Sequence, residues 1–226
     1  GGNTEAHHNP PVLADRDAEA NTPELAAIGD RYASTARELH ERELLVSVLD
    51  AWSGDAPDDK DVLKANALVK SAPQRSRDVV AGYGEIWSAR MLAALLKREN
   101  EKRGGTWVDA RKVVTVHETE LGPSVLWDES QARFDDVLPA DFEGIAVITG
   151  FIASDEEGLQ TTLGRNGSDF SAAIFAALSK AAELTIWCDV NGVMSADPNR
   201  VPEAQVIERL TYSVAMELAY FGTAVI

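Results

Sequence analysis

The sequence has little cysteine, little positive charge and no long apolar run, and each shortage excludes a class of protein. Cys188 is the one cysteine, so no intrachain disulfide can form, which suits a reducing cytoplasm. Lysine and arginine total 21 against 37 acidic residues, a formal net charge of −16 that argues against binding nucleic acid or an anionic membrane. No apolar run approaches the roughly 18 residues of a membrane span. We therefore expect a cytoplasmic protein with no nucleic-acid and no membrane partner.

The chain does have enough apolar residues for a sizeable core. Its 226 residues are 45% hydrophobic, which fits one large α/β domain or two small ones. The adjacent histidines His7 and His8 lie in a segment rich in glycine and proline, without the spaced third and fourth ligands that a metal needs. The sequence therefore predicts no protein metal site there.

Apolar periodicity predicts helices first and then strands that alternate with helices. Helices are predicted over residues 24–52, as one helix or two, and over 61–70, 77–97, 129–138, 170–182 and 211–221. Strands are predicted over residues 106–108, 113–116, 144–152 and 184–188. A polar loop is expected over residues 154–160, and Val214 and Met216 are expected to face the core. Such alternation favours a mainly parallel sheet, in which ligands bind at the carboxyl ends of the strands.

The segment from Gly164 to Asp169 connects a predicted strand to a predicted helix and is a candidate anion site. A glycine-containing turn at a helix start leaves backbone N–H groups unpaired beside the positive end of the helix dipole. Arg165 adds a guanidinium that can bind a carboxylate or phosphate with two hydrogen bonds. The same residues are also compatible with an ordinary turn and N-cap.

Two acidic residues flank this candidate site in the sequence. Glu85 lies among apolar neighbours of the 77–97 helix, next to Gly82 and Gly84, so it either reaches to water or lines a pocket. Asp189 stands where the 184–188 strand ends, and the turn-rich segment 190–202 follows it. A long loop beside a ligand site is commonly functional.

Five motifs in this order resemble the catalytic domain of aspartate kinases, over about Glu24 to Ile226. The motifs are Gly82-Tyr83-Gly84-Glu85, Val147 to Ala153, Leu163 to Asp169, Ile186 to Val193 and Tyr220-Phe221-Gly222. The sequence is most similar to the kinase half of bifunctional aspartokinase–homoserine dehydrogenases. The resemblance implies the amino-acid-kinase fold, a three-layer αβα sandwich with a mainly parallel sheet. It also implies ATP-dependent phosphorylation of the β-carboxylate of L-aspartate, the first step towards lysine, threonine and methionine.

The resemblance also implies roles for residues that would bind aspartate. Arg165 would hold a substrate carboxylate and act in catalysis, and Glu85 would pair with the substrate ammonium. Gly167 and Ser168 would present N–H groups to aspartate or to the transferred phosphate. Asp169 resembles the family's catalytic acid, which orients a lysine on the phosphates. Thr4, in a stretch similar to the family's second-strand turn, would be a further substrate contact.

The nucleotide side follows from the later motifs. Residues similar to the family's contacts with Mg²⁺-bound ATP are Cys188, Asp189, Met194, Asn199 and Arg200. We expect residues 1–143 to form the aspartate-binding side and residues 144–226 the ATP-binding side of one catalytic domain. A homo-oligomer and fusion to homoserine dehydrogenase in the full-length protein are the expected assembly.

The sequence departs from the family pattern at both ends. The family opens with a strand carrying Lys-Phe-Gly-Gly-Thr-Ser, which has no counterpart here, so we expect a domain without its first strand and its last part. Asn199 replaces an arginine and Ala224 replaces a frequent lysine. Two alternatives therefore stay open: a ligand-binding or interaction module of the same fold, and a kinase for another amino acid.

Overall fold

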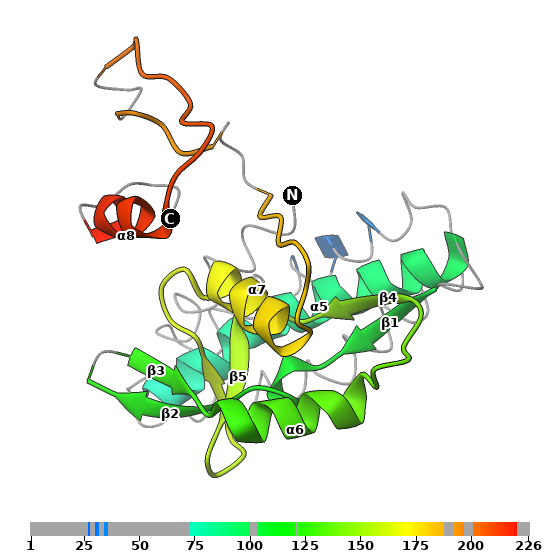
Figure 1. Ribbon diagram of the computed structural model, residues 1–226. Coiled ribbons are helices and arrows are strands. Elements are labelled where there is room, and N and C mark those ends of the chain that lie inside the picture. The colour runs from blue at the N-terminus through cyan, green and yellow to red at the C-terminus, as the bar shows by residue number, and fades with distance from the viewer. Residues whose placement is uncertain are drawn as a thin grey trace. The chain divides into compact units, whose positions relative to one another are not determined.

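The computed structural model describes residues 27, 30–31, 34–35, 73–99, 104–120, 122–187, 192–196 and 201–220. The chain divides into two compact units, Gly1–Lys180 and Ala181–Ile226 (Figure 1). Ala27, Asp30 and Thr35, which fall within the first predicted helix, are helical. The helix predicted over residues 61–70 lies outside the described residues.

Helix α5 (Gln74–Glu99) is the longest element described and confirms the helix predicted over residues 77–97. Apolar side chains three or four residues apart form a buried face, on which Tyr83 and Trp87 stack with ring centroids 5.6 Å apart. Ile86, on the same face, is among the most completely buried side chains. Packing of this face anchors the helix in the core.

Length and composition alone would allow α5 to cross a membrane. This corrects the expectation that no apolar run is long enough. Half of its apolar window is buried inside the protein, which is typical of a core helix. Its apolar residues therefore serve the packing of the first unit.

The strands form two short sheets in the first unit. Strands β1 (Gly105–Val108) and β4 (Ile145–Ile148) pair in parallel. The second sheet has the order β3-β2-β5-β6, formed by β3 (Gly122–Val125), β2 (Thr115–Thr119), β5 (Ile152–Asp155) and β6 (Gln160–Thr162). The β2–β5 pair is parallel, whereas β2–β3 and β5–β6 are antiparallel hairpins. Segments distant in the sequence thus pair in parallel, and neighbouring segments pair in antiparallel fashion.

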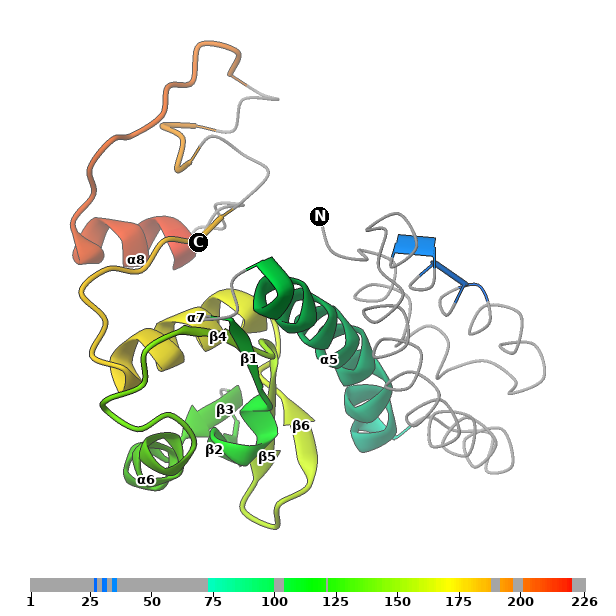
Figure 2. The same ribbon diagram turned by 90° about the vertical axis from the view of Figure 1, so that its right-hand side faces the viewer.

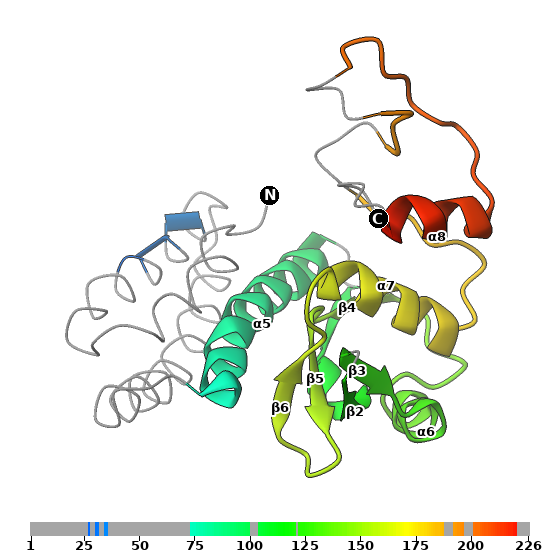
Figure 3. The same cartoon turned by 90° about the vertical axis from the view of Figure 1, so that its left-hand side faces the viewer.

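Helices cover both faces of these strands. Helix α5 lies on one side, and α6 (Trp127–Val137) and α7 (Gly167–Leu178) lie on the other (Figures 2 and 3). Phe134 of α6 and Phe175 of α7 pack against each other, with ring centroids 6.3 Å apart. The arrangement confirms the predicted α/β class with three layers and parallel strand pairing.

The single strand predicted over residues 144–152 is wrong, because two strands replace it. Residues 149–151 separate β4 from β5, and Phe151 adopts a positive φ of 68°. The 3-10 helix η1 (Ala110–Lys112) occupies the equivalent place between β1 and β2. The chain therefore passes from the two-stranded sheet to the four-stranded sheet twice, from β1 to β2 and from β4 to β5, at equivalent positions. The apolar pattern of residues 144–152 predicted one strand because it does not specify which strands pair.

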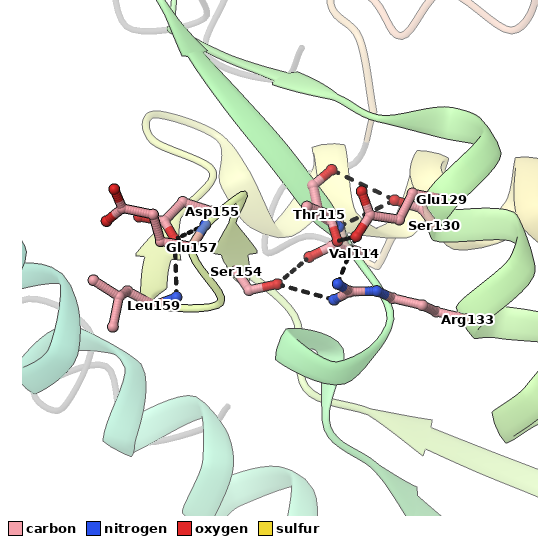
Figure 4. A network of polar contacts seen from close by, with 9 residues as sticks. All are labelled: Val114, Thr115, Glu129, Ser130, Arg133, Ser154, Asp155, Glu157 and Leu159. Carbon is pink, nitrogen blue, oxygen red and sulfur yellow. Dashed lines mark hydrogen bonds and ion pairs between the residues drawn. The ribbon is translucent and has the colours of Figure 1, made fainter.

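The polar loop predicted over residues 154–160 is a β-hairpin instead. Asp155 ends β5, and its carboxylate accepts hydrogen bonds from the N–H groups of Glu157 (3.0 Å) and Leu159 (2.8 Å), as Figure 4 shows. Gly158 adopts a φ of 78°, which favours glycine. The polar residues therefore build a turn that brings β6 beside β5.

The second unit differs most from the predictions. Residues 184–187 form no strand, and Trp187 is 92% exposed. A strand needs a partner, and within the described ranges this segment pairs with none. Helix α8 (Tyr212–Tyr220) confirms the last predicted helix, but Val214 and Met216 are exposed rather than core-facing.

Candidate active site

The turn between β6 and α7 holds the candidate anion site. Gly164 has a φ of 73°, and Asn166 has a φ of 56° in the left-handed region. The N–H of Gly167 donates to the carbonyl of Gly164 (3.1 Å), and Phe170 makes the first helical bond, to Asn166 (3.0 Å). The chain therefore reverses within three residues and enters α7 directly.

Gly167 is required because α7 begins in close contact with the strand crossover. A Cβ built on Gly167 would lie 2.8 Å from Cδ2 of Phe151 and 3.2 Å from Cβ of Leu163. Distances below about 3 Å are not tolerated by packed carbon atoms. Any larger residue at this position would push the first turn of α7 away from the core.

The first turn of α7 leaves donors for a ligand. Since Phe170 makes the first helical bond, the N–H groups of Ser168 and Asp169 have no intrahelical partner. Asn166 makes no side-chain cap hydrogen bond to them. Arg165 is exposed, and its side chain makes no hydrogen bond or ion pair with other residues in the part of the chain that the structure describes. N–H groups, helix dipole and guanidinium therefore offer positive potential in one short segment.

Helix α5 is tied to β6, the strand that leads into this turn. The side-chain amide of Gln160 donates to the carbonyls of Asp78 (2.9 Å) and Val79 (3.1 Å). A Cβ on Gly82 would collide with the same amide and lie 3.0 Å from Cγ2 of Ile152. Gly82 thus lets α5 approach the sheet closely. Glu85 follows less than one turn later and is half-buried.

Asp78 adds a buried carboxylate to the contact between α5 and β6. It accepts hydrogen bonds from Nε2 of Gln74 (2.8 Å) and Oγ1 of Thr162 (3.2 Å). Burial raises the pKa of Asp78 above its ordinary value of 3.8, and these two hydrogen bonds and the charge of Arg77 offset part of that rise. The carboxylate links the last residue of β6 to the first turns of α5.

Arg111 extends the same contact to the β1–β2 crossover. Its Nη1 donates to Oε1 of Gln160 (2.8 Å), and its Nη2 donates to Oδ2 of Asp109 (2.7 Å). The Asp109 side chain, only 6% exposed, also caps η1 by accepting from the N–H of Arg111. Sequence reasoning missed Asp78, Asp109, Arg111 and Gln160. Their contacts between elements join residues far apart in the chain, and only the Gln74–Asp78 and Asp109–Arg111 spacings are local.

A second polar cluster fixes α6 to the sheet (Figure 4). Oγ of Ser154 donates to the carbonyl of Val114 (3.3 Å), and Arg133 donates to the same Oγ (3.5 Å). Oγ of Ser130 accepts from the N–H of Thr115 (3.1 Å). Ser130 and Thr115 are fully buried, so these bonds satisfy groups that water cannot reach. This cluster holds the scaffold and lies outside the turn at α7.

The predicted nucleotide contacts fall in the second unit or outside the described residues. Met194 forms an isolated antiparallel bridge with Val206, beside the bond from the N–H of Ser195 to the carbonyl of Gln205 (2.8 Å). Met194 is half-buried there. The predicted site residues that lie outside the described residues are Thr4, Cys188, Asp189, Asn199 and Arg200. Glu85, Arg165, Gly167, Ser168 and Asp169 all belong to the first unit.

Comparison with known proteins finds a matching family and similar relatives. Residues 24–226 match the amino acid kinase family. The chloroplastic bifunctional aspartokinase/homoserine dehydrogenase 1 of Arabidopsis thaliana is 40% identical over 205 residues, which are 89% of this chain. The corresponding protein of Daucus carota is 39% identical over 207 residues, again 89% of this chain. The chain spans 22% of the length of each of these two relatives.

A solved structure is also similar. The crystal structure of Escherichia coli aspartokinase III in complex with aspartate and ADP, in its R state, superposes with a TM-score of 0.78. The two chains are 26% identical, and the match covers 98% of this chain and 48% of the other. Similarity of both fold and sequence therefore extends over nearly the whole chain.

Proposed function

The chain belongs to the amino acid kinase family, and on that premise we propose that it phosphorylates the β-carboxylate of L-aspartate with ATP. The observation that carries the proposal is the turn at the start of α7. It combines the N–H groups of Ser168 and Asp169 with the exposed guanidinium of Arg165. The relatives named aspartokinases and the similar structure solved with aspartate and ADP support the choice of substrates.

In the proposed reaction, an oxygen of the β-carboxylate attacks the γ-phosphorus of ATP. A new P–O bond forms while the bond to the oxygen bridging the β- and γ-phosphates breaks, and ADP leaves. Both reactants are anionic, so the protein must position them and neutralise charge. The N–H groups at the start of α7 and the dipole of that helix would stabilise charge on the transferred group.

The amino-acid end of aspartate needs a different set of partners. Arg165 would bind a carboxylate of the substrate with two parallel hydrogen bonds. Glu85, on the helix tied to β6, would pair with the ammonium group. Asp169 would orient a cationic side chain against the phosphates. Recognition of both the carboxylate and the ammonium selects an α-amino acid.

ATP and Mg²⁺ are the proposed co-substrate and cofactor. Mg²⁺ usually binds through one or two carboxylates together with substrate phosphates, and it supplies positive charge that offsets the phosphate oxygens. Within the described ranges no group of three or more His, Cys, Asp and Glu side chains could hold a metal ion. We propose that Mg²⁺ enters with the nucleotide, bound to its phosphates. We propose Cys188, Asp189, Met194, Asn199 and Arg200 as nucleotide contacts and Thr4 as a further aspartate contact.

The proposal is tested by ATP-dependent formation of aspartyl hydroxamate from aspartate and hydroxylamine. Replacing Arg165 with alanine should raise the KM for aspartate by about 100-fold, since two charge-assisted hydrogen bonds are lost. Arg75→Ala is the matched control. Arg75 is an exposed arginine of the same unit, and it forms ion pairs with Asp155 and Glu157 at the β5–β6 hairpin. Equal activity of the two variants would contradict the role of Arg165.

Substrate range separates the proposal from its alternatives. Glu85→Gln should weaken aspartate binding but leave the KM for ATP unchanged, because Glu85 is proposed to contact the ammonium group of aspartate and not the nucleotide. Turnover of glutamate in place of aspartate would indicate another amino-acid kinase. Calorimetric binding of aspartate with no turnover of ATP would indicate a ligand-binding module.

An assembly and a cellular location complete the proposal. We propose that residues 1–143 form the aspartate side and residues 144–226 the ATP side, in a homo-oligomer of a protein fused to homoserine dehydrogenase. The names of the two plant relatives support the fusion. The reaction would open the route to lysine, threonine and methionine. We propose a cytoplasmic location, with the chloroplast named for the plant relatives as the alternative.

A further inference from the structure

The crossover between β4 and β5 contains a residue in an unfavourable backbone conformation. Phe151 has a φ of 68°, in a region where a bulky side chain is a genuine outlier. Such a conformation persists only where the surrounding structure enforces it, and outliers of this kind cluster at functional sites. The contacts that hold Phe151 in place therefore indicate what the conformation serves.

Both ends of the glycine turn are attached to this one residue. The N–H of Leu163, just before the turn, donates to the carbonyl of Phe151 (2.8 Å). Just after the turn, the Cα of Gly167 lies so close to the Phe151 ring that a Cβ would be 2.8 Å from it. The position of the turn from Gly164 to Asn166 thus depends on the position of Phe151.

Ser171 holds Phe151 from the other side. The N–H of Phe151 donates to Oγ of Ser171 (2.6 Å), and the same Oγ donates to the carbonyl of Gly167 (2.7 Å). The side chain of Ser171 is buried, with only 4% of the residue exposed, so water cannot replace it in these bonds. One hydroxyl therefore joins the strained crossover to the first turn of α7.

We propose that Ser171 is a positioning residue for the anion site at the start of α7. Through Phe151 and Gly167, its hydroxyl fixes where the N–H groups of Ser168 and Asp169 point. This inference rests on the proposed function, because the groups that it positions are the proposed donors to the transferred phosphoryl group. Ser171 itself contacts neither substrate.

A purely structural role is the competing explanation. Serine hydroxyls in helices commonly bond to the carbonyl four residues earlier, with no consequence for a site. Ser179, the C-cap residue of α7, provides that case: its Oγ donates to the carbonyl of Phe175 (2.7 Å), and it makes no hydrogen bond to the β4–β5 crossover among the described residues. Ser179→Ala is therefore the matched control for Ser171→Ala.

Kinetics of the purified chain provide the first test. Ser171→Ala should lower kcat by about 10- to 100-fold, the effect expected when donors are misplaced by about 1 Å. The KM for ATP should stay within about twofold, and Ser171→Thr, which keeps the hydroxyl, should restore most of kcat. Ser179→Ala should leave kcat unchanged. Equal kcat values for Ser171→Ala and Ser179→Ala would overturn the proposal.

Amide hydrogen exchange provides a test that does not depend on turnover. In Ser171→Ala the Phe151 N–H loses its acceptor, so exchange should accelerate at Phe151 and at Gly167, whose N–H donates to the carbonyl of Gly164, while residues 174–178 keep wild-type protection. Unchanged exchange at Phe151 would overturn the positioning role. If Ser171→Ala shows these changes in exchange but the wild-type chain phosphorylates no amino acid, the proposed function fails and the positioning of the α7 turn by Ser171 stands. Should Ser171→Ala fail to fold, Ser171→Cys, with a weak acceptor of similar size, should give intermediate exchange and intermediate kcat; wild-type values for it would overturn the proposal.

Discussion

Asn166 occupies a backbone conformation that glycine adopts at lower cost. Its φ is 56°, and its side chain makes no cap hydrogen bond, so the asparagine gains little in return. Asn166→Gly should change the free energy of unfolding by less than about 0.5 kcal/mol, because the relief offsets the added entropy of the unfolded chain. Asn166→Ala should destabilise by about 1 kcal/mol, which lowers Tm by about 2–4 °C for a chain of this length.

The control for Asn166 places glycine where φ is already favourable. Ala173 is exposed within α7, so Ala173→Gly should destabilise by about 1 kcal/mol. Thermal and urea unfolding measure all three variants. A loss of stability in Asn166→Gly as large as that in Ala173→Gly would contradict the left-handed conformation of Asn166.

Asp78 should make stability depend on pH. Burial raises its folded pKa above the ordinary value of 3.8, so the folded chain binds a proton more tightly than the unfolded chain. The stability present below the ordinary pKa is therefore lost as pH rises through the raised value. Asp78→Asn cannot ionise, yet its Oδ1 can still accept from Gln74 and Thr162.

Urea unfolding between about pH 3 and about pH 7 tests this effect, because that range spans the ordinary carboxyl pKa and the region above it. Asp78→Asn should lose less stability than wild type on going to the higher pH. Asp136→Asn, at an exposed position of α6, controls for the removal of one negative charge. A steeper loss for Asp78→Asn than for wild type would contradict the raised pKa.

At the scale of elements, we expect substitutions on the two sides of the contact between α5 and β6 to have non-additive effects on stability. A methyl group at Gly82 would collide with the Gln160 amide and approach Ile152, so Gly82→Ala should destabilise by about 1–3 kcal/mol. Gln160→Ala should cost about 1–2 kcal/mol, since the bonds to the Asp78 and Val79 carbonyls and from Arg111 are lost. The double variant should lose less than the sum, because alanine at position 160 makes room for the new methyl group. Strict additivity in urea unfolding would show that Gly82 and Gln160 do not touch.

Helices of this chain could be predicted from the sequence, and several strands could not. The periodicity of apolar residues around Tyr83 and Ile86 sufficed for α5, and similar patterns gave α6, α7 and α8 within a few residues of their ends. The break at residues 149–151 could not be predicted, because the switch between sheets is set by pairing partners and not by local composition. Residues 184–187 have the composition of a buried strand but form none. Apolar composition indicates that a segment tends to be buried, whereas it becomes a strand only when a neighbouring strand pairs with it.

The candidate site likewise has residues that local sequence identified as candidates and contacts that it could not identify. Arg165, Gly167 and Ser168 were identifiable because their geometry is local: a glycine turn that opens a helix. The contacts that hold this turn are not local. Ser171 meets Phe151, and Gln160 meets Arg111 across 49 positions of sequence. A single sequence carries no signal for such pairs.

At the scale of the whole molecule, net charge opposes the proposed substrates. The chain carries a formal net charge of −16, while aspartate and ATP are both anions, so long-range repulsion should slow their approach. Contacts with Arg165 and the N–H groups at α7 act over a few ångströms and are screened less by salt. The Debye length falls from about 30 Å at 0.01 M to about 8 Å at 0.15 M ionic strength. Added salt should therefore weaken the long-range repulsion between the chain and its substrates more than it weakens the short-range contacts with Arg165 and the N–H groups.

We accordingly expect the KM for aspartate to fall, by about twofold or more, as ionic strength rises from about 0.01 M to about 0.15 M at constant free Mg²⁺. The hydroxamate assay measures it with potassium chloride as the added salt. Arg75→Ala and Arg165→Ala each remove one positive charge, so both should keep the downward trend, while only Arg165→Ala starts from a raised KM. A KM that rises with salt in wild type and stays flat in Arg165→Ala would mean that attraction at Arg165 outweighs the field of the whole chain.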